Sequence, residues 1–138
     1  MTQQEQQARV PNVSYDSAEQ VIFVDFTDSF LTSLVLEQVF ADIIAVSQSL
    51  PNKVYLLACF QNAKLDAAAA TVFSDLSVVI FSHVLGMVRY AVGDLMANVT
   101  IRSTTVKQHL QGTQSHIYKN RAEALAAIHQ LQQKEREV

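Results

Sequence analysis

The sequence offers few side chains whose types and spacing suit catalysis or metal binding. Cys59 lies in the apolar run VYLLACF, where a thiol behaves as a small hydrophobic group and not as a reactive thiolate. Asp25 and Asp28 are close enough in sequence for acid–base chemistry, but they also suit a strand end and a helix cap, the role we favour. The four histidines lack the close spacing of metal ligands (His83, His109, His116 and His129). We therefore expect no enzyme activity, no metal site and no cofactor.

Two further features bear on ligand binding. The three glycines, Gly86, Gly93 and Gly112, each stand alone, so the chain has no glycine-rich loop to hold a nucleotide phosphate. Arg89 interrupts an apolar strand, and wherever it is shielded from water its guanidinium needs a carboxylate, backbone carbonyls or a bound anion. Arg89 could contact an anion or a partner. The simpler alternative is that it lies at an edge of the sheet or faces solvent, and this is what we expect.

Length and composition indicate a single domain. A chain of 138 residues with 49% hydrophobic residues can bury a sizeable core. We expect this domain over residues 12–132, between a flexible tail at 1–11 and a polar tail at 133–138. One cysteine cannot form an internal disulfide, and the amino terminus does not resemble a signal peptide, so we expect a cytoplasmic protein.

The most apolar region, residues 67–88, raises the question of a membrane span. Asp75 and His83 interrupt it, and a buried helix followed by a buried strand explains it better. Residues 1–80 carry nine acidic and three basic residues, whereas residues 81–138 carry four acidic and seven basic ones. This asymmetry permits an anionic partner but fits ordinary solvated charge, and we expect no nucleic-acid partner.

The pattern along the chain predicts alternating strands and helices. Two β-rich runs around a polar turn, at 13–15 and 21–26, predict an opening hairpin. Then follow a helix that ends before Pro51, an apolar strand at 53–60, and a helix capped by Asp66. The remaining predicted elements are a strand at 87–94, a helix at 97–112, a short strand at 115–120 and a helix at 121–138. The last helix has an apolar stripe, formed by Ala122, Leu125, Ile128 and Leu131. The order β-β-α-β-α-β-α-β-α predicts an α/β fold, a single-domain mixed β-sheet with helices packed against it.

Two segments resemble the SpoIIAA-like branch of the STAS domain superfamily. HVLGMVRYAVGD, residues 83–94, is similar to the penultimate strand of that branch, which reads like riAvvGd. SHIYKNRAEALAAIHQL, residues 115–131, is similar to its carboxyl-terminal piece. The likeness covers residues 13–131 and its motifs are mainly structural, so the resemblance implies a SpoIIAA/STAS-like fold more directly than any activity.

The resemblance also bears on the four consecutive alanines of LDAAAATVF. STAS proteins of the anti-anti-sigma type carry a phosphorylatable serine in a motif like DSSGL, where a helix follows the central strand. Laid on this chain the motif reads DAAAA, so the resemblance implies a degenerate phosphoacceptor position at Asp66, Ala67 and Ala68. Thr71 and Ser74 lie nearby, and packing or solubility explains them better than phosphorylation does.

From this resemblance we expect a non-enzymatic interaction or regulatory module that binds a partner protein or a small ligand. The alternative is an apolar-ligand or lipid-binding protein, because the STAS fold is often compared with that of lipid-carrying CRAL-TRIO domains and the chain has an apolar surplus. Apolar residues after position 75 spread over more of the helix circumference than one sheet contact needs, which predicts a homodimer or apolar-ligand surface. Its members are Leu76, Val79, Ile80, Val84 and Leu85.

Overall fold

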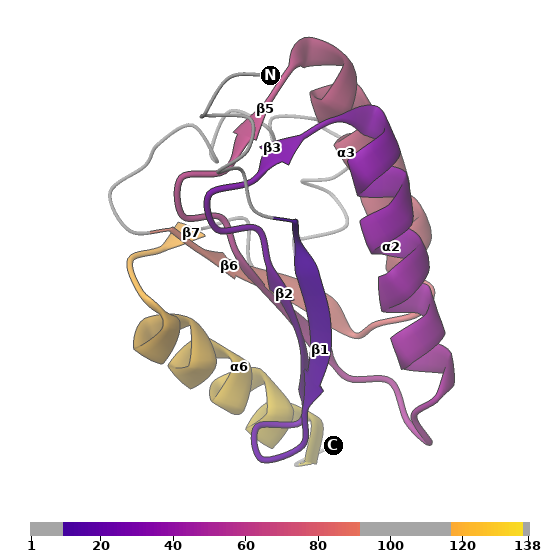
Figure 1. The fold of residues 1–138 in the computed structure, drawn as a ribbon. Helices are drawn as coiled ribbons and strands as arrows, with labels where there is room; N and C mark the ends of the chain where they lie inside the picture. Colours follow the sequence, from indigo (N-terminus) through magenta and orange to yellow (C-terminus); the bar gives the residue numbers. More distant parts are fainter. Residues whose placement is uncertain (1–9, 92–116, 137–138) are drawn as a thin grey trace.

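The computed structural model, which describes residues 10–91 and 117–136, begins with an antiparallel hairpin (Figure 1). Its strands are β1 (Asn12–Asp16) and β2 (Val21–Asp25). Asp16 shapes the turn, because its Oδ1 accepts hydrogen bonds from the backbone N–H groups of Ala18 and Glu19, both at 3.1 Å. The predicted hairpin is confirmed.

The hairpin is part of a mixed sheet in which the described strands have the order β1-β2-β4-β6-β7. β4 (Tyr55–Cys59), β6 (Gly86–Tyr90) and β7 (Ile117–Tyr118) run parallel to β2, so the carboxyl ends of these strands meet at one edge. Every residue of β4 and β6 is buried, as expected of apolar strands covered on both faces. The prediction of a mixed sheet with helices against it is confirmed.

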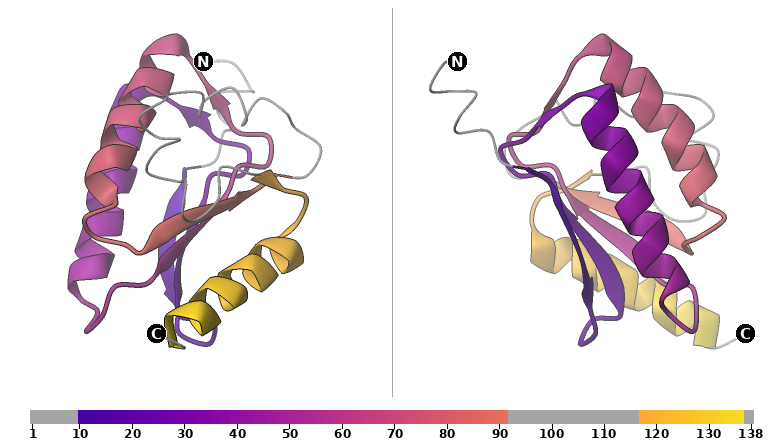
Figure 2. Two further views of the ribbon diagram at one scale, coloured as in Figure 1. Left: turned by 180° about the vertical axis from the view of Figure 1, so that it is seen from behind. Right: turned by 45° about the vertical axis from the view of Figure 1, so that its right-hand side comes forward.

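Helices cover both faces of this sheet. α2 (Ser33–Gln48) and α3 (Ala67–Ile80) lie side by side on one face, and α6 (Arg121–Arg136) lies on the other (Figure 1 and Figure 2). In the core under α2 and α3 the rings of Phe26 and Phe60 stack with centroids 4.8 Å apart. Ala124 and Ile128 of α6 belong to a second core on the opposite face. The sheet therefore separates two cores.

A two-stranded parallel sheet, β3 (Phe30–Leu31) with β5 (Lys64–Leu65), is a feature that the sequence did not predict. It forms just after β2 and β4 end. Asp28 and Asn62 lie in these two connections in the left-handed conformation, with φ of 56° and 55°, which short polar side chains tolerate. Asn62 Nδ2 donates to Asp28 Oδ1 at 3.1 Å, so the two bends are tied to each other.

α6 begins at Arg121, as predicted, but its carboxyl-terminal segment and its buried face differ from what we expected. It continues to Arg136, through most of the segment that we expected to be a polar tail. Its buried face is centred on Ala124 and Ile128, both fully buried, with Leu125 partly buried beside them, whereas Ala122 is exposed. The expected stripe is therefore wrong at its first position.

Two predictions lie outside the described residues, namely the helix at 97–112 and most of the amino-terminal tail. Within residues 10–91 and 117–136, no helix is long and apolar enough to cross a membrane.

Candidate functional site

The candidate site lies where α2 and α3 begin. β3 and β5 pair in register, so the residues that follow them, Thr32 and Asp66, start two helices next to each other (Figure 1). Thr32 Oγ1 accepts the backbone N–H of Val35 at 3.2 Å, and Asp66 Oδ1 accepts that of Ala69 at 2.7 Å. Each oxygen satisfies a backbone donor that a helix start leaves without a partner, so both helix starts are fixed by side chains.

The alanines that the STAS resemblance implies to be a degenerate phosphoacceptor position differ in exposure. Ala67 and Ala68 are exposed, whereas Ala69 is fully buried in the core under α2 and α3. Asp66 is exposed too, and it caps the helix as predicted. The start of α3 therefore presents two methyl groups to solvent, and no side-chain oxygen, at positions 67 and 68.

The nearby hydroxyl groups bond to their own helix. Thr71 Oγ1 donates to the carbonyl oxygen of Ala67 at 3.4 Å, and Ser74 Oγ donates to that of Ala70 at 3.2 Å. These are local bonds of the kind that serine and threonine make within helices. Our expectation that packing or solubility explains both residues stays a prediction.

Two large apolar side chains are exposed at this helix start. Phe30 of β3 is 52% exposed and Leu34, the second residue of α2, is 77% exposed. Neither α2 nor α3 has an acidic residue in its first turn. Among the described residues, this helix start therefore presents apolar side chains to solvent.

The predicted dimer or apolar-ligand surface is not one surface. Ile80 and Val84 are 0% and 2% exposed and belong to the core under α2 and α3, and Leu76 is partly buried against it. Val79 and Leu85 are exposed, at 52% and 38%. The prediction is wrong for Ile80 and Val84, because α2 packs beside α3 and covers apolar positions that the sequence pattern left without a partner.

Arg89 is 1% exposed, so our expectation of an edge or solvent-facing position is wrong. It lies in β6, which has β4 on one side and β7 on the other. Burial lowers the pKa of its guanidinium to about 10. The other reading of Arg89, contact with an anion or a partner, stays a prediction.

A polar cluster that the sequence analysis missed lies at the carboxyl ends of β4 and β6, on the α6 side of the sheet. Cys59 Sγ is 3.3 Å from Thr27 Oγ1. Burial and, to a lesser extent, the hydrogen bond with Cys59 raise the pKa of the Tyr90 hydroxyl to about 12, whereas Arg121 acts in the opposite direction. Arg121 in turn donates to Asp16 Oδ2 at 3.2 Å. These contacts join the start of α6 to the sheet.

The thiol and the hydroxyl group of this cluster are both buried. Cys59 is 4% exposed and Tyr90 is 8% exposed, so the thiol is the core group that the apolar run around it predicted. The two residues meet because they are partners in the parallel pairing of β4 with β6. Two short apolar runs do not specify the register in which two strands pair. The contact between Cys59 and Tyr90 therefore could not be predicted from the sequence.

Asp25 lies at a strand end, as favoured, whereas the expected role of Asp28 as a helix cap is wrong, because Thr32 caps α2. Asp25 Oδ1 accepts the backbone N–H of Thr27 at 2.9 Å, and Asp28 receives the hydrogen bond from Asn62. In the part of the chain that the structure describes, no three histidine, cysteine, aspartate or glutamate side chains come together as a metal site.

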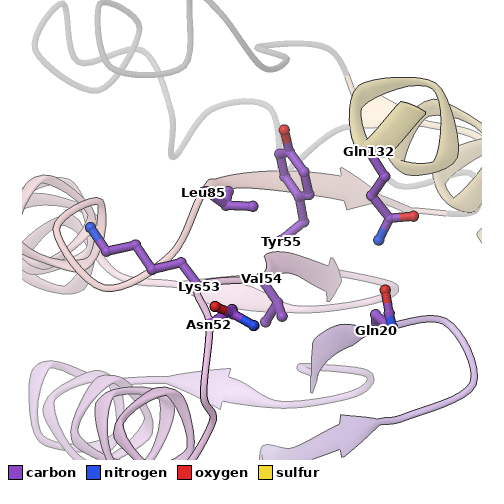
Figure 3. Close-up of a pocket in the computed structure, with 7 residues that line it drawn as sticks. All are labelled: Gln20, Asn52, Lys53, Val54, Tyr55, Leu85 and Gln132. Carbon is purple, nitrogen blue, oxygen red and sulfur yellow. The ribbon is translucent and has the colours of Figure 1, made fainter. Parts of the chain in front are cut away.

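Two cavities lie at the opposite edge of the sheet, where the parallel strands begin. The larger, of about 610 Å³, is bounded by the end of the hairpin turn, the start of β4, the residue before β6 and α6 (Figure 3). A neighbouring cavity of about 530 Å³ lies between the hairpin turn and α6. Polar side chains predominate among the described residues that line both.

Comparison of the chain with protein-family models, with curated proteins and with solved structures gave no match in any of the three.

Proposed function

We propose that this chain is a non-enzymatic, STAS-like interaction module of the SpoIIAA-like type that binds a partner protein where α2 and α3 begin. The observation that carries the proposal is the exposure of Leu34 and Phe30, 77% and 52%, at this paired helix start. Exposed apolar side chains that gather at one place are typical of interaction sites, whereas scattered ones need no explanation.

The regulatory part of the proposal rests on the resemblance. A phosphoserine at a helix start adds about −1.5 to −2 charges there, which changes what the surface can bind. Ala67 and Ala68 have no oxygen to accept a phosphoryl group. Binding at this surface is therefore independent of a serine kinase, in contrast to that of the phosphorylated STAS proteins which the chain resembles.

Phosphosite mapping tests this point. After incubation with a kinase of the anti-sigma type, the chain should carry no phosphate at residues 67 and 68. Phosphate on Thr71 or Ser74 that changes the affinity for a partner would contradict a lost switch.

The apolar-ligand alternative gains no support from the two cavities, because most of the described side chains that line them are polar. A homodimer is one form that the proposed interaction can take, since a second copy of the chain can serve as the partner.

Site-specific photo-crosslinking tests the binding surface directly. A photoreactive phenylalanine analogue at position 34, introduced in cells, should give a discrete covalent adduct with one protein. The matched control is position 45 of α2, because Ala45 is exposed and lies three turns further along the same helix. An adduct of twice the chain mass would identify the partner as a second copy.

A charge substitution then measures the contribution of the surface to binding. Leu34→Glu should weaken the complex with the crosslinked partner at least about tenfold, because a charge would be buried in an apolar contact. Ala45→Glu adds the same charge away from the helix start and should bind like the original protein. Equal binding by both variants, or equal crosslinking at positions 34 and 45, would disprove the proposed surface.

A further inference from the structure

β1 forms an outer edge of the main sheet. In the part of the chain that the structure describes, β1 pairs with β2 alone, and no further strand lies on its other side (Figure 1). Proteins commonly protect such an edge with lysine, with proline inside the strand or with a bulge. The sequence of β1, NVSYD, has no lysine or proline, and its pairing with β2 runs through all five residues without a bulge. The edge is therefore open to a strand of another molecule.

The side chains of β1 alternate between the two faces of the sheet. Val13 packs partly against the core under α2 and α3, and Tyr15 faces the same side and is 38% exposed. Asn12, Ser14 and Asp16 face the opposite side, where the carboxylate of Asp16 accepts a hydrogen bond from α6. β1 thus has an apolar pair on one face and three polar residues on the other.

This pattern is complementary to itself under a two-fold axis. If β1 pairs antiparallel with β1 of a second copy about an axis through Ser14, residues at equal distances from the axis meet on the same face. Val13 then lies opposite Tyr15 of the second copy, an aliphatic–aromatic pair of the kind that stabilises sheets. Asn12 lies opposite Asp16, whose two oxygens accept three hydrogen bonds within the chain and have a lone pair left for the Asn12 amide.

The residues that flank β1 favour this register over its neighbours. An axis through Val13 would place Pro11 opposite Tyr15 of the second copy, although proline has no N–H to donate between strands. An axis through Tyr15 would bring Ser17, a residue of the hairpin turn, into the pairing. The axis through Ser14 uses all five residues of β1 and excludes both flanking positions.

We propose that the edge of β1 pairs with the same edge of a second copy of the chain, which joins the two five-stranded sheets into one. The occupant is a second copy, and not an unrelated peptide, because each half of the β1 pattern has its complement in the other half. The contact is short, so the dimer dissociates on dilution. The proposal goes beyond the docking at the start of α2 and α3, a site to which β1 contributes no residue.

Disulfide crosslinking tests the register. Pairing about Ser14 places the Cα atoms of the two Ser14 residues about 4.5–5.5 Å apart, a separation that a disulfide spans. Ser14→Cys should therefore give a covalent dimer under mild oxidation. Asn12→Cys is the matched control, because it is also exposed and lies on the same strand and face. The two Asn12 residues would lie four positions, about 13 Å, apart along the strands, too far for a disulfide. The buried Cys59 is common to both variants.

Charge substitutions test the same contact without crosslinking, by sedimentation velocity over a range of concentrations. Ser14→Lys and Ser14→Glu each place two like charges opposite each other and should weaken the dimer about fivefold. An equimolar mixture of the two variants should recover it. Ala18→Lys adds the same charge in the exposed hairpin turn and should dimerise like the original protein. Leu34→Glu, which alters the docking site proposed above, should also leave the dimer unchanged.

Three results would overturn the proposal. These are a monomer at every concentration up to about millimolar, equal crosslinking at positions 12 and 14, and a dimer that both Ser14 charge variants leave unchanged. A dimer that is lost in Leu34→Glu but kept in Ser14→Lys would likewise exclude the β1 edge, and it would support the docking site at the start of α2 and α3 instead.

Discussion

Ile128 fixes α6 to the sheet, and the loss of its side chain should destabilise the protein measurably. It is 0% exposed and belongs to the core that includes Val21, Leu57 and Val88. Replacement of a buried isoleucine by alanine costs about 2–5 kcal/mol, and the cost rises with the volume of the cavity that remains. Ala124, also 0% exposed, already brings the backbone of α6 close to the sheet, so the helix cannot move inward to fill that cavity. We therefore expect Ile128→Ala to lower the free energy of unfolding by about 3 kcal/mol.

Urea denaturation followed by circular dichroism measures this loss. The midpoint should fall while the slope of the free energy against denaturant stays unchanged, and the melting temperature should fall by roughly 10 °C. Gln130→Ala, an exposed position of the same helix, is the matched control and should change the free energy of unfolding by less than about 0.5 kcal/mol. A loss below about 1 kcal/mol for Ile128→Ala, or one equal to that of the control, would refute the docking of α6 described above.

Two further predictions concern the cap of α3 and the alkaline range. Asp66→Ala should cost about 1 kcal/mol in urea denaturation, and Asp66→Asn much less, because asparagine keeps the capping oxygen. The pKa of Tyr90 in the folded protein is about 12, above its ordinary value of 10, so its contribution to stability is complete below pH 10 and is lost between pH 10 and 12. The lowered pKa of Arg89, about 10, acts in the opposite sense over the same range. Tyr90→Phe should therefore make the free energy of unfolding rise more, or fall less, between pH 10 and 12 than it does in the original protein. Identical pH profiles of the two proteins would contradict the raised pKa of Tyr90.

The parts of the fold that the sequence predicted are those with a long periodic pattern. The apolar spacing of α2, the continuous apolar run of β4 and the cap of α3 each depend on near neighbours in the chain, so local patterns reveal them. β3 and β5 are two residues each and exist because Asp28 and Asn62 bend two distant connections in the same way. No local pattern encodes a strand of that length.

The candidate site shows the same division between local and long-range information. The exposure of Leu34 and Phe30, and the cavity near Tyr55, depend on how elements far apart in sequence come together. Arg89 was placed wrongly for a related reason, because a charged residue in an apolar strand suggests an edge, yet β6 lies inside the sheet. Burial of a strand on both faces and both edges follows from strand order, which short apolar runs do not specify.

An aspartate at position 66, which the motif DSSGL of the resemblance also has, does not by itself indicate a former phosphorylation switch. Asp66 Oδ1 accepts the N–H of Ala69 at 2.7 Å, and a helix start needs such a cap whether or not a phosphoacceptor follows. The informative positions are 67 and 68, because both side chains are exposed and packing does not require alanine there. At position 69 packing does require a small apolar residue, since Ala69 is 0% exposed in the core.

Serine substitutions separate these two explanations of the alanines. Ala68→Ser should cost no more than about 0.5 kcal/mol, the difference in helix propensity, whereas Ala69→Ser places a hydroxyl in the core and should cost about 1–3 kcal/mol. Urea denaturation of both variants measures the difference. If Ala68→Ser proves as costly as Ala69→Ser, packing excludes serine from position 68, and the lack of a hydroxyl there carries no information about regulation. If Ala68→Ser is tolerated, the fold permits a phosphoacceptor at this helix start.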